Sequence, residues 1–299
     1  MKARIGFSTV LLLTVPPLLW AGNAIVGRLV KDAVPPMTLN LLRWSIALLI
    51  LLPLGRAAFR PGSGALVHWR RYALLGLFGI GLYNSFQYLA LQSSTPINVT
   101  LVAAGLPVWM MLVGRLFFKV PARPWQALGA VLSIAGVLVV LCRGDWQQLA
   151  ALRLVPGDLY MILATIAWSF YSWMLMQKKD APALRADWAA FLLVQVLYGV
   201  ACSSALSALE WTAGAPRPIA WSGPLAAALA YVAIGPAILA FRCWGAGVAR
   251  AGPAVGAFFV NLTPLFAALM SAAFLGDPPH LYHLLAFALI VGGIGVSAR

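Results

Sequence analysis

Long apolar stretches alternate with short polar separators along the whole chain. Ten stretches are long and apolar enough to be membrane-spanning helices, which need about 20 mostly apolar residues each. They run over residues 6–30, 37–54, 72–91, 96–118, 125–141, 157–177, 188–209, 223–245, 254–275 and 281–297. The separators are rich in proline, glycine and charged residues, which break helices and form turns. The pattern therefore predicts an all-α membrane protein with ten transmembrane helices.

The composition is that of a protein whose solvent is lipid. Of the 299 residues, 62% are hydrophobic and 9% are charged, and the mean hydropathy is +0.90. So few charged groups cannot cover a surface that faces water, and the short loops leave no room for an extramembrane catalytic domain. Cys142, Cys202 and Cys243 stand apart in apolar surroundings, so we expect no disulfide framework, no metal site and no cofactor.

The basic residues predict one orientation in the membrane. If both termini are cytoplasmic, most of the 21 basic residues lie on the inner side, and Arg28, Lys31, Arg143, Arg153 and Arg217 lie outside. Cytoplasmic loops carry an excess of Lys and Arg, so we expect a multi-pass protein of the bacterial inner membrane with cytoplasmic termini. The charges are scattered over many loops, so the net charge of +14 does not indicate nucleic-acid binding.

The first apolar segment permits a second interpretation. Lys2 and Arg4 precede an apolar run and the small residues Ala21–Ala24, as in a cleaved secretory signal. The apolar run continues to Val30, however, and has a counterpart in the second half of the chain. We interpret it as a retained first helix.

The two halves of the chain repeat one another. Two prolines of the fourth segment, Pro96 and Pro107, are followed 157 positions later by two prolines of the ninth. Five helices per half is an odd number, so the second half would enter the membrane from the opposite side. The pattern predicts two inverted five-helix repeats, residues 1–149 and 150–299, which is an arrangement used for alternating access. The alternative is coincidence in a biased composition.

Short motifs in both halves resemble a known family. Tyr88–Leu91 ends the third segment, Leu106–Val108 lies in the fourth, and Asn261–Leu265 repeats the latter element in the ninth. With these motifs the chain resembles the EamA branch of the drug/metabolite transporter superfamily, and within it bacterial aromatic amino acid exporters. The resemblance implies ten helices in two repeats and the transport of small metabolites. Asp277 departs from the glutamate that members commonly have after the ninth helix.

Polar and aromatic side chains near the middle of the segments are the candidate substrate contacts, because polar groups are costly in hydrocarbon unless they face a cavity or another helix. Trp20 and Trp168, 148 positions apart, are the strongest candidates. The complete predicted set is Trp20, Asn23, Tyr83, Asn84, Gln87, Tyr88, Trp109, Trp168, Tyr171, Trp244, Phe258 and Asn261. These residues would line an uncharged, aromatic cavity suited to an amphipathic aromatic substrate.

Each candidate also has a structural interpretation. The rings could pack against lipid, and the amides of Asn23, Asn84, Gln87 and Asn261 could form interhelical hydrogen bonds. Arg43 and Arg242 are the formal charges well inside segments. We expect both to extend toward the lipid headgroups, the alternative being that Arg43 neutralises a carboxylate.

Prolines and glycines at membrane depth predict irregular helices and close packing. Pro16–Pro17, Pro107, Pro236 and Pro264 each remove a backbone hydrogen bond and are expected to interrupt their helices. Small residues let neighbouring helices approach closely. Those expected to do so are Gly76, Gly79, Gly81, Gly129 and Gly136.

The sequence therefore favours a non-enzymatic exporter of aromatic amino acids or similar amphipathic metabolites, acting as a monomer or weak homodimer in the lipid bilayer. No Asp or Glu falls in the middle of a segment, which favours gradient-driven efflux over proton coupling. A transporter of nucleotide sugars or other polar metabolites would need several basic residues at the midplane, and an enzyme would need clustered catalytic groups. The pattern leaves a non-transporting scaffold open.

Overall fold

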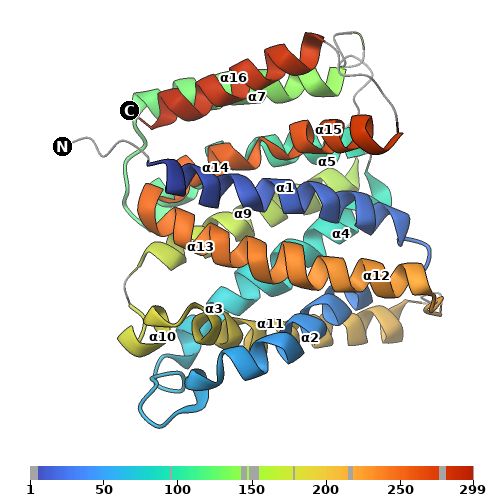
Figure 1. The fold of residues 1–299 in the computed structure, drawn as a ribbon, viewed down its shortest axis with the longest axis vertical. Coiled ribbons are helices and arrows are strands. Elements are labelled where there is room, and N and C mark those ends of the chain that lie inside the picture. The colour runs from blue at the N-terminus through green and yellow to red at the C-terminus, as the bar shows by residue number, and fades with distance from the viewer. Residues whose placement is uncertain are drawn as a thin grey trace.

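The computed structural model describes residues 6–94, 96–142, 147, 155–177, 179–214, 218–275 and 281–298. Within these ranges every regular element is a helix (Figure 1). Helices satisfy their own backbone hydrogen bonds, which lipid cannot do for them. The all-α prediction is confirmed.

The helices follow one another as α1 (Phe7–Leu29), α2 (Pro36–Leu54), η1 (Arg56–Phe59), α3 (Trp69–Gly76), η2 (Leu77–Leu82), α4 (Tyr83–Ser93), α5 (Pro96–Ala104), α6 (Leu106–Phe117), α7 (Pro124–Cys142), α9 (Pro156–Met176), α10 (Pro182–Ala186), α11 (Trp188–Ala213), α12 (Gly223–Val232), η3 (Ala233–Leu239), α13 (Ala240–Ala251), α14 (Pro253–Val260), α15 (Thr263–Leu275) and α16 (Leu281–Ser297). η1 is a 3₁₀-helix, whereas η2 and η3 are π-helical segments inside longer spans.

Eight helices of the described residues are long and apolar enough to cross a membrane. They are Phe7–Gly27, Pro36–Leu54, Trp69–Ser93, Pro124–Cys142, Pro156–Met176, Trp188–Ala213, Gly223–Ala251 and Pro253–Met270. α5 and α6 meet at a bend of 42° and together would form a ninth span. α16 is apolar but has 17 residues, so the count of ten stays a prediction.

The helices form one bundle (Figure 1). α7 and α16 form one edge, α2, α3 and α11 form the other, and α1, α4, α9 and α13 lie between them. α1 begins and α16 ends on the same side of the bundle (Figure 1). Leu116, Phe117, Leu281 and Leu284 are exposed on its outside, where lipid tails are the expected neighbours.

The prolines interrupt some spans and not others. α5 ends at Ala104 and α6 begins at Leu106, directly before Pro107. The corresponding break between α14 and α15 precedes Pro264, and Pro236 lies in the π-helix η3. α1, in contrast, continues as one helix through Pro16–Pro17, so the expected interruption there is wrong.

The predicted close approach of helices at glycines is confirmed. A Cβ atom on Gly129 of α7 would lie 2.7 Å from the carbonyl oxygen of Gly293 of α16, which is too close for a real contact. A Cβ on Gly76 would lie 2.5 Å from the carbonyl oxygen of Gln195 in α11. At each edge of the bundle, therefore, two helices pack backbone against backbone: α7 against α16 at one edge and α3 against α11 at the other.

Neighbouring glycines of α16 give a matched test of this packing. A Cβ on Gly293 would lie 2.7 Å from the carbonyl oxygen of Gly129, whereas one on Gly292 would meet nothing within 4 Å. We expect Gly293→Ala to lower the free energy of unfolding by about 1–3 kcal/mol, because α7 and α16 must separate. Gly292→Ala should leave it unchanged or raise it by up to about 1 kcal/mol, since alanine favours the helix. Thermal unfolding in detergent measures both, and equal midpoints would contradict the packing.

Candidate functional site

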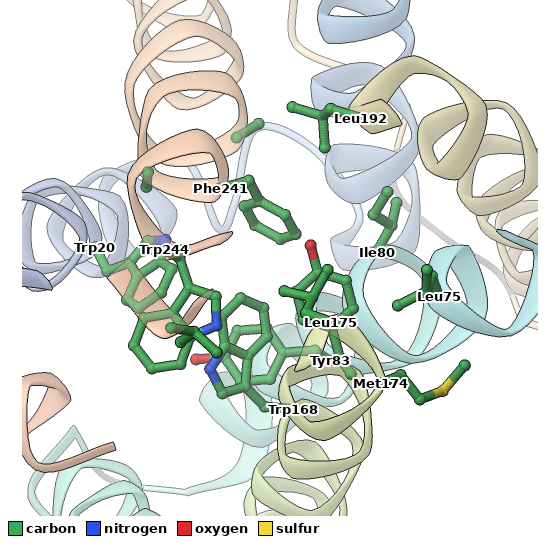
Figure 2. Packing of buried hydrophobic residues seen from close by; sticks show 14 of the residues in the cluster. Trp20, Leu75, Ile80, Tyr83, Trp168, Met174, Leu175, Leu192, Phe241 and Trp244 are labelled. Atoms are coloured by element: carbon green, nitrogen blue, oxygen red, sulfur yellow. The ribbon is translucent and has the colours of Figure 1, made fainter. Parts of the chain in front are cut away.

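Seven buried rings meet in the middle of the bundle, and we call them the aromatic cluster. Its members are Trp20, Trp44, Tyr83, Trp168, Tyr171, Phe241 and Trp244. They come from α1, α2, α4, α9 and α13, so both halves of the chain contribute. Figure 2 shows the labelled rings of Trp20, Tyr83, Trp168, Phe241 and Trp244 facing one another.

Trp168 is the centre of the aromatic cluster. Its ring centroid lies 4.6 Å from that of Tyr83, 5.1 Å from Trp20 and 5.4 Å from Trp244. The Trp20 and Trp168 rings are perpendicular, an edge-to-face geometry that aromatic quadrupoles favour. Two tryptophans that lie 148 positions apart in the sequence are therefore in direct contact.

Hydrogen bonds hold two of the four indoles of the aromatic cluster, whereas the Nε1–H groups of Trp44 and Trp168 have no acceptor among the described residues. The Nε1–H of Trp20 donates to the carbonyl oxygen of Pro236 at 3.3 Å, and that of Trp244 donates to Oγ of Ser172 at 3.1 Å. The buried Nε1–H of Trp168 has no acceptor in the part of the chain that the structure describes. The central indole therefore has an unused donor.

The π-helical segments supply carbonyl oxygens to side chains of other helices. A π-helix shifts the backbone hydrogen-bond register, and such segments are frequent at functional sites. In η2 the carbonyl of Ile80 accepts from Asn40 at 3.3 Å and that of Gly79 accepts from Asn84 at 3.4 Å. In η3 the carbonyl of Pro236 accepts from Trp20. The irregular turns thus orient predicted site residues.

A second group, which we call the Arg43 cluster, consists of Arg43, Asn23, Asn84 and Tyr88. Nη1 of Arg43 donates to Oδ1 of Asn84 at 2.9 Å, to the hydroxyl oxygen of Tyr88 at 3.2 Å and to Oδ1 of Asn23 at 3.4 Å. The Arg43 residue is 0% exposed. The expectation that Arg43 extends to the lipid headgroups is therefore wrong, and the interior beside the aromatic cluster carries a formal charge.

Arg242 behaves differently from Arg43. Its side chain is exposed, and its guanidinium lies 4.3 Å from the ring centroid of Trp188. This is a cation–π contact near the end of a span. The expectation of a peripheral position holds for Arg242 alone.

The remaining predicted residues divide between the site and the scaffold. Gln87 lies beside the hydroxyl of Tyr83. Asn261 donates to the carbonyl of Ala104 at 3.2 Å and to Oγ of Ser133 at 2.8 Å, so it joins α14 to α5 and α7. Phe258 is buried in α14, and Trp109 is half-buried in α6. Among the described rings, neither of these two contacts the aromatic cluster.

Sequence reasoning missed three members of the two clusters. Two of them are Phe241 and Trp44, which are buried and whose ring centroids lie 4.9 Å apart. The third is Arg43, which was expected at the lipid headgroups. A signal existed for Phe241, which precedes Trp244 by three positions and therefore shares its helix face. Trp44 had none, because a tryptophan at that depth equally suits a lipid-facing position.

α9, which carries Trp168 and Tyr171, is anchored at both ends. At its C-terminal end the carboxylate of Asp180 pairs with Arg71 and, at 2.5 Å, with Arg185. Arg71 also donates to the carbonyl of Gln177 at 2.7 Å. At the N-terminal end Asp158 accepts from the backbone N–H of Val155 at 2.9 Å and from Nδ2 of Asn98 at 3.0 Å. These contacts fix the helix that holds the central ring.

The shared carboxylate of Asp180 can be tested against one of its partners. The Asp180 side chain is 0% exposed and those of Arg71 and Arg185 are 11% and 29% exposed. We expect Asp180→Asn to lower the free energy of unfolding by about 3 kcal/mol or more, because two partly buried guanidiniums lose their counter-charge. Arg185→Gln should cost about 1 kcal/mol, since Asp180 keeps Arg71. The reverse order in thermal unfolding would refute this assignment.

Comparison with known proteins places the chain among transporters. An uncharacterized transporter of Archaeoglobus fulgidus is 26% identical over 291 residues, which cover 96% of each chain. The aromatic amino acid exporter YddG of Ancylobacter novellus is 26% identical over 295 residues, covering 98% of this chain and 95% of its own. A crystal structure that is 23% identical and covers 97% of this chain and 96% of its own has a TM-score of 0.71, so the fold is shared.

A family comparison covers nearly the whole length. The profile of the EamA-like transporter family matches residues 7–142 and residues 155–299. The apolar helices of the structure agree with a membrane transporter. The chain therefore belongs to the EamA-like transporter family.

Proposed function

We propose that the protein exports aromatic amino acids or similar amphipathic metabolites by alternating access. The observation that carries the proposal is the aromatic cluster, a group of buried rings built from helices of both halves. Indole and phenyl groups stack favourably on such rings, in offset or edge-to-face geometry. The relative named an aromatic amino acid exporter supports the same class of cargo.

Two inverted five-helix halves, residues 1–149 and 150–299, would provide the alternating access. Matching irregularities support them. The spans Trp69–Ser93 and Gly223–Ala251 each contain a π-helical segment, η2 and η3. The next span of each half is broken, between α5 and α6 and between α14 and α15. Inverted halves of this kind hold substrate near the midplane and rock about it.

In this mechanism the substrate takes the place of ring-to-ring contacts. The rings of the aromatic cluster now contact one another, and Trp168 touches those of Trp20, Tyr83 and Trp244. A cavity forms when α1 and α13 move relative to α9, and an aromatic side chain then stacks on Trp168. The exchange of one ring contact for another keeps the free-energy difference between empty and loaded states small, which suits a carrier that must also release its cargo.

The charges of the site favour facilitated efflux. No carboxylate contacts the aromatic cluster in the described ranges, and a proton-coupled pathway usually contains such a group. A nucleotide sugar would need several cations for its phosphates, whereas among the described side chains Arg43 is the single arginine buried beside the rings. The proposed setting is the bacterial inner membrane, with cytoplasmic termini and a monomer or weak homodimer as the working unit.

Substitution of the central ring tests the proposal. In liposomes loaded with L-tryptophan, we expect purified protein to take up labelled L-tryptophan and L-phenylalanine by counterflow, and L-leucine far more slowly. Trp168→Leu should lower the initial L-tryptophan rate about tenfold, the effect of losing one aromatic stacking partner. Trp221→Leu, at a residue 65% exposed, serves as the control and should leave the rate unchanged.

Two results would contradict the proposal. One is counterflow of aliphatic or polar solutes with none of the aromatic amino acids. The other is an L-tryptophan rate that Trp168→Leu and Trp221→Leu alter equally, because the aromatic cluster would then be packing alone.

A further inference from the structure

Arg43 is a buried cation with no counter-charge among the residues that the structure describes. The residue is 0% exposed, and a guanidinium stays protonated in proteins. Its partners Asn23, Asn84 and Tyr88 are all neutral. In the described part of the chain the ion pairs join Asp180 to Arg71 and Arg185, and none includes Arg43. A buried charge without an opposite charge is strongly destabilising, so its retention needs an explanation.

The guanidinium has one used side and one unused edge. Nη1 donates to all three neutral partners, whereas Nε and Nη2 bond to no group of the described residues. In a guanidinium the N–H bonds of Nε and Nη2 run parallel along one edge. That edge matches the two oxygens of a carboxylate and makes the bidentate pair for which arginine is the preferred residue.

The partners of Nη1 fix the direction of this edge. Asn84 is held by the carbonyl of Gly79 at 3.4 Å, and the hydroxyl of Tyr88 donates to Oδ1 of Asn23 at 3.2 Å. The acceptors of Nη1 are thus themselves hydrogen-bonded. If Arg43 only joined helices, Nε and Nη2 would be expected to donate to protein acceptors as Nη1 does, because unsatisfied buried donors are costly.

The Arg43 cluster adjoins the aromatic cluster. The guanidinium carbon of Arg43 lies 5.3 Å from the ring centroid of Trp44, and its charge interacts electrostatically with the hydroxyl of Tyr83. The Tyr83 ring lies 4.6 Å from that of Trp168. A ligand with a carboxylate a few bonds from an aromatic ring can therefore contact both clusters at once.

We propose that the Nε–Nη2 edge of Arg43 binds the carboxylate of the transported aromatic amino acid, while Asn23, Asn84 and Tyr88 hold the guanidinium in place. This assignment rests on the proposed function and adds the group that recognises the cargo as an acid. The aromatic cluster selects the side chain, and Arg43 selects the carboxylate.

Three ligands that share one ring system isolate the contribution of the carboxylate. They are L-tryptophan, indole-3-propionate, which lacks the amine, and tryptamine, which lacks the carboxylate. Binding to the purified full chain in lipid nanodiscs is measured by calorimetry. We expect the two acids to bind about tenfold or more tightly than tryptamine, as a charge-assisted bidentate pair implies. This comparison needs no mutation.

Variants then assign the effect to Arg43. In Arg43→Gln the affinity for both acids should fall to that for tryptamine, while the affinity for tryptamine is unchanged or higher. Arg43→Lys should recover part of the loss, because it restores the charge without the paired edge. Arg242→Gln is the matched control, since this exposed arginine lies over Trp188, and it should bind all three ligands as the native chain does.

The outcomes separate this inference from the proposed function. Equal binding of L-tryptophan and tryptamine by the native chain would overturn the role of Arg43 and leave aromatic export intact. Binding of L-leucine but not L-tryptophan, lost in Arg43→Gln, would overturn the aromatic cargo and keep the carboxylate site. If no carboxylate binds, or if chloride alone binds in an Arg43-dependent way, the inference fails.

Discussion

The interior of this protein is built under one constraint, namely that lipid offers no hydrogen bonds to a polar group. Each buried donor or acceptor must find its partner within the protein or remain unsatisfied. The amide nitrogen of Asn40 in α2 shows the usual solution, because it donates to the carbonyl of Ile80 and to the hydroxyls of Ser85 and Ser203, at 3.1–3.3 Å, whereas the amide oxygen has no partner among the described residues. The same constraint makes the exceptions informative, and Arg43 and Trp168 are two of them.

Trp168, one of these exceptions, lies on a helix that is held at both ends. α9 carries Trp168 and is held at its ends by Asp158 and Asp180, while the glycines at η2 let neighbouring rings approach closely. A Cβ on Gly79 would lie 2.5 Å from the ring of Tyr171. The helix that carries Trp168 is thus anchored and tightly packed around an indole with an unused donor, which is the arrangement expected of a pre-organised binding site.

How much the sequence could predict depends on the kind of signal. Trp20 and Trp168 were predictable because depth in a span and correspondence between halves both follow from counting residues. The close approach of a neighbouring helix to α7 was predictable because Gly129 and Gly136, seven positions apart, share a helix face, although that the neighbour is α16 was not. Each of these signals comes from spacing within one helix or from one fixed offset between the halves of the sequence.

The environment of Arg43 was not predictable in this way. Its depth fits both an extended side chain that reaches the headgroups and a buried one, and the choice depends on which helices lie opposite. Asn261 shows the same limit, since its depth suits both a substrate contact and an interhelical hydrogen bond, and its amide nitrogen bonds to Ala104 and Ser133 of neighbouring helices. Composition and periodicity predict how deep a polar residue lies in the membrane, whereas the partners of Arg43 depend on how α1, α2 and α4 are arranged in space.

The guanidinium of Arg43, which has no counter-charge among the described residues, would also link cargo binding to closure of the site in the proposed transport cycle. A ligand shifts a conformational equilibrium only by its differential affinity for the two states. When the site is open to water, Arg43 is solvated whether or not cargo is bound. When the site closes, an empty site leaves the guanidinium unpaired in a low dielectric, whereas a loaded site gives it a carboxylate. Closure is then favoured for the loaded carrier, so one buried charge would couple the movement of the halves to the presence of an acid.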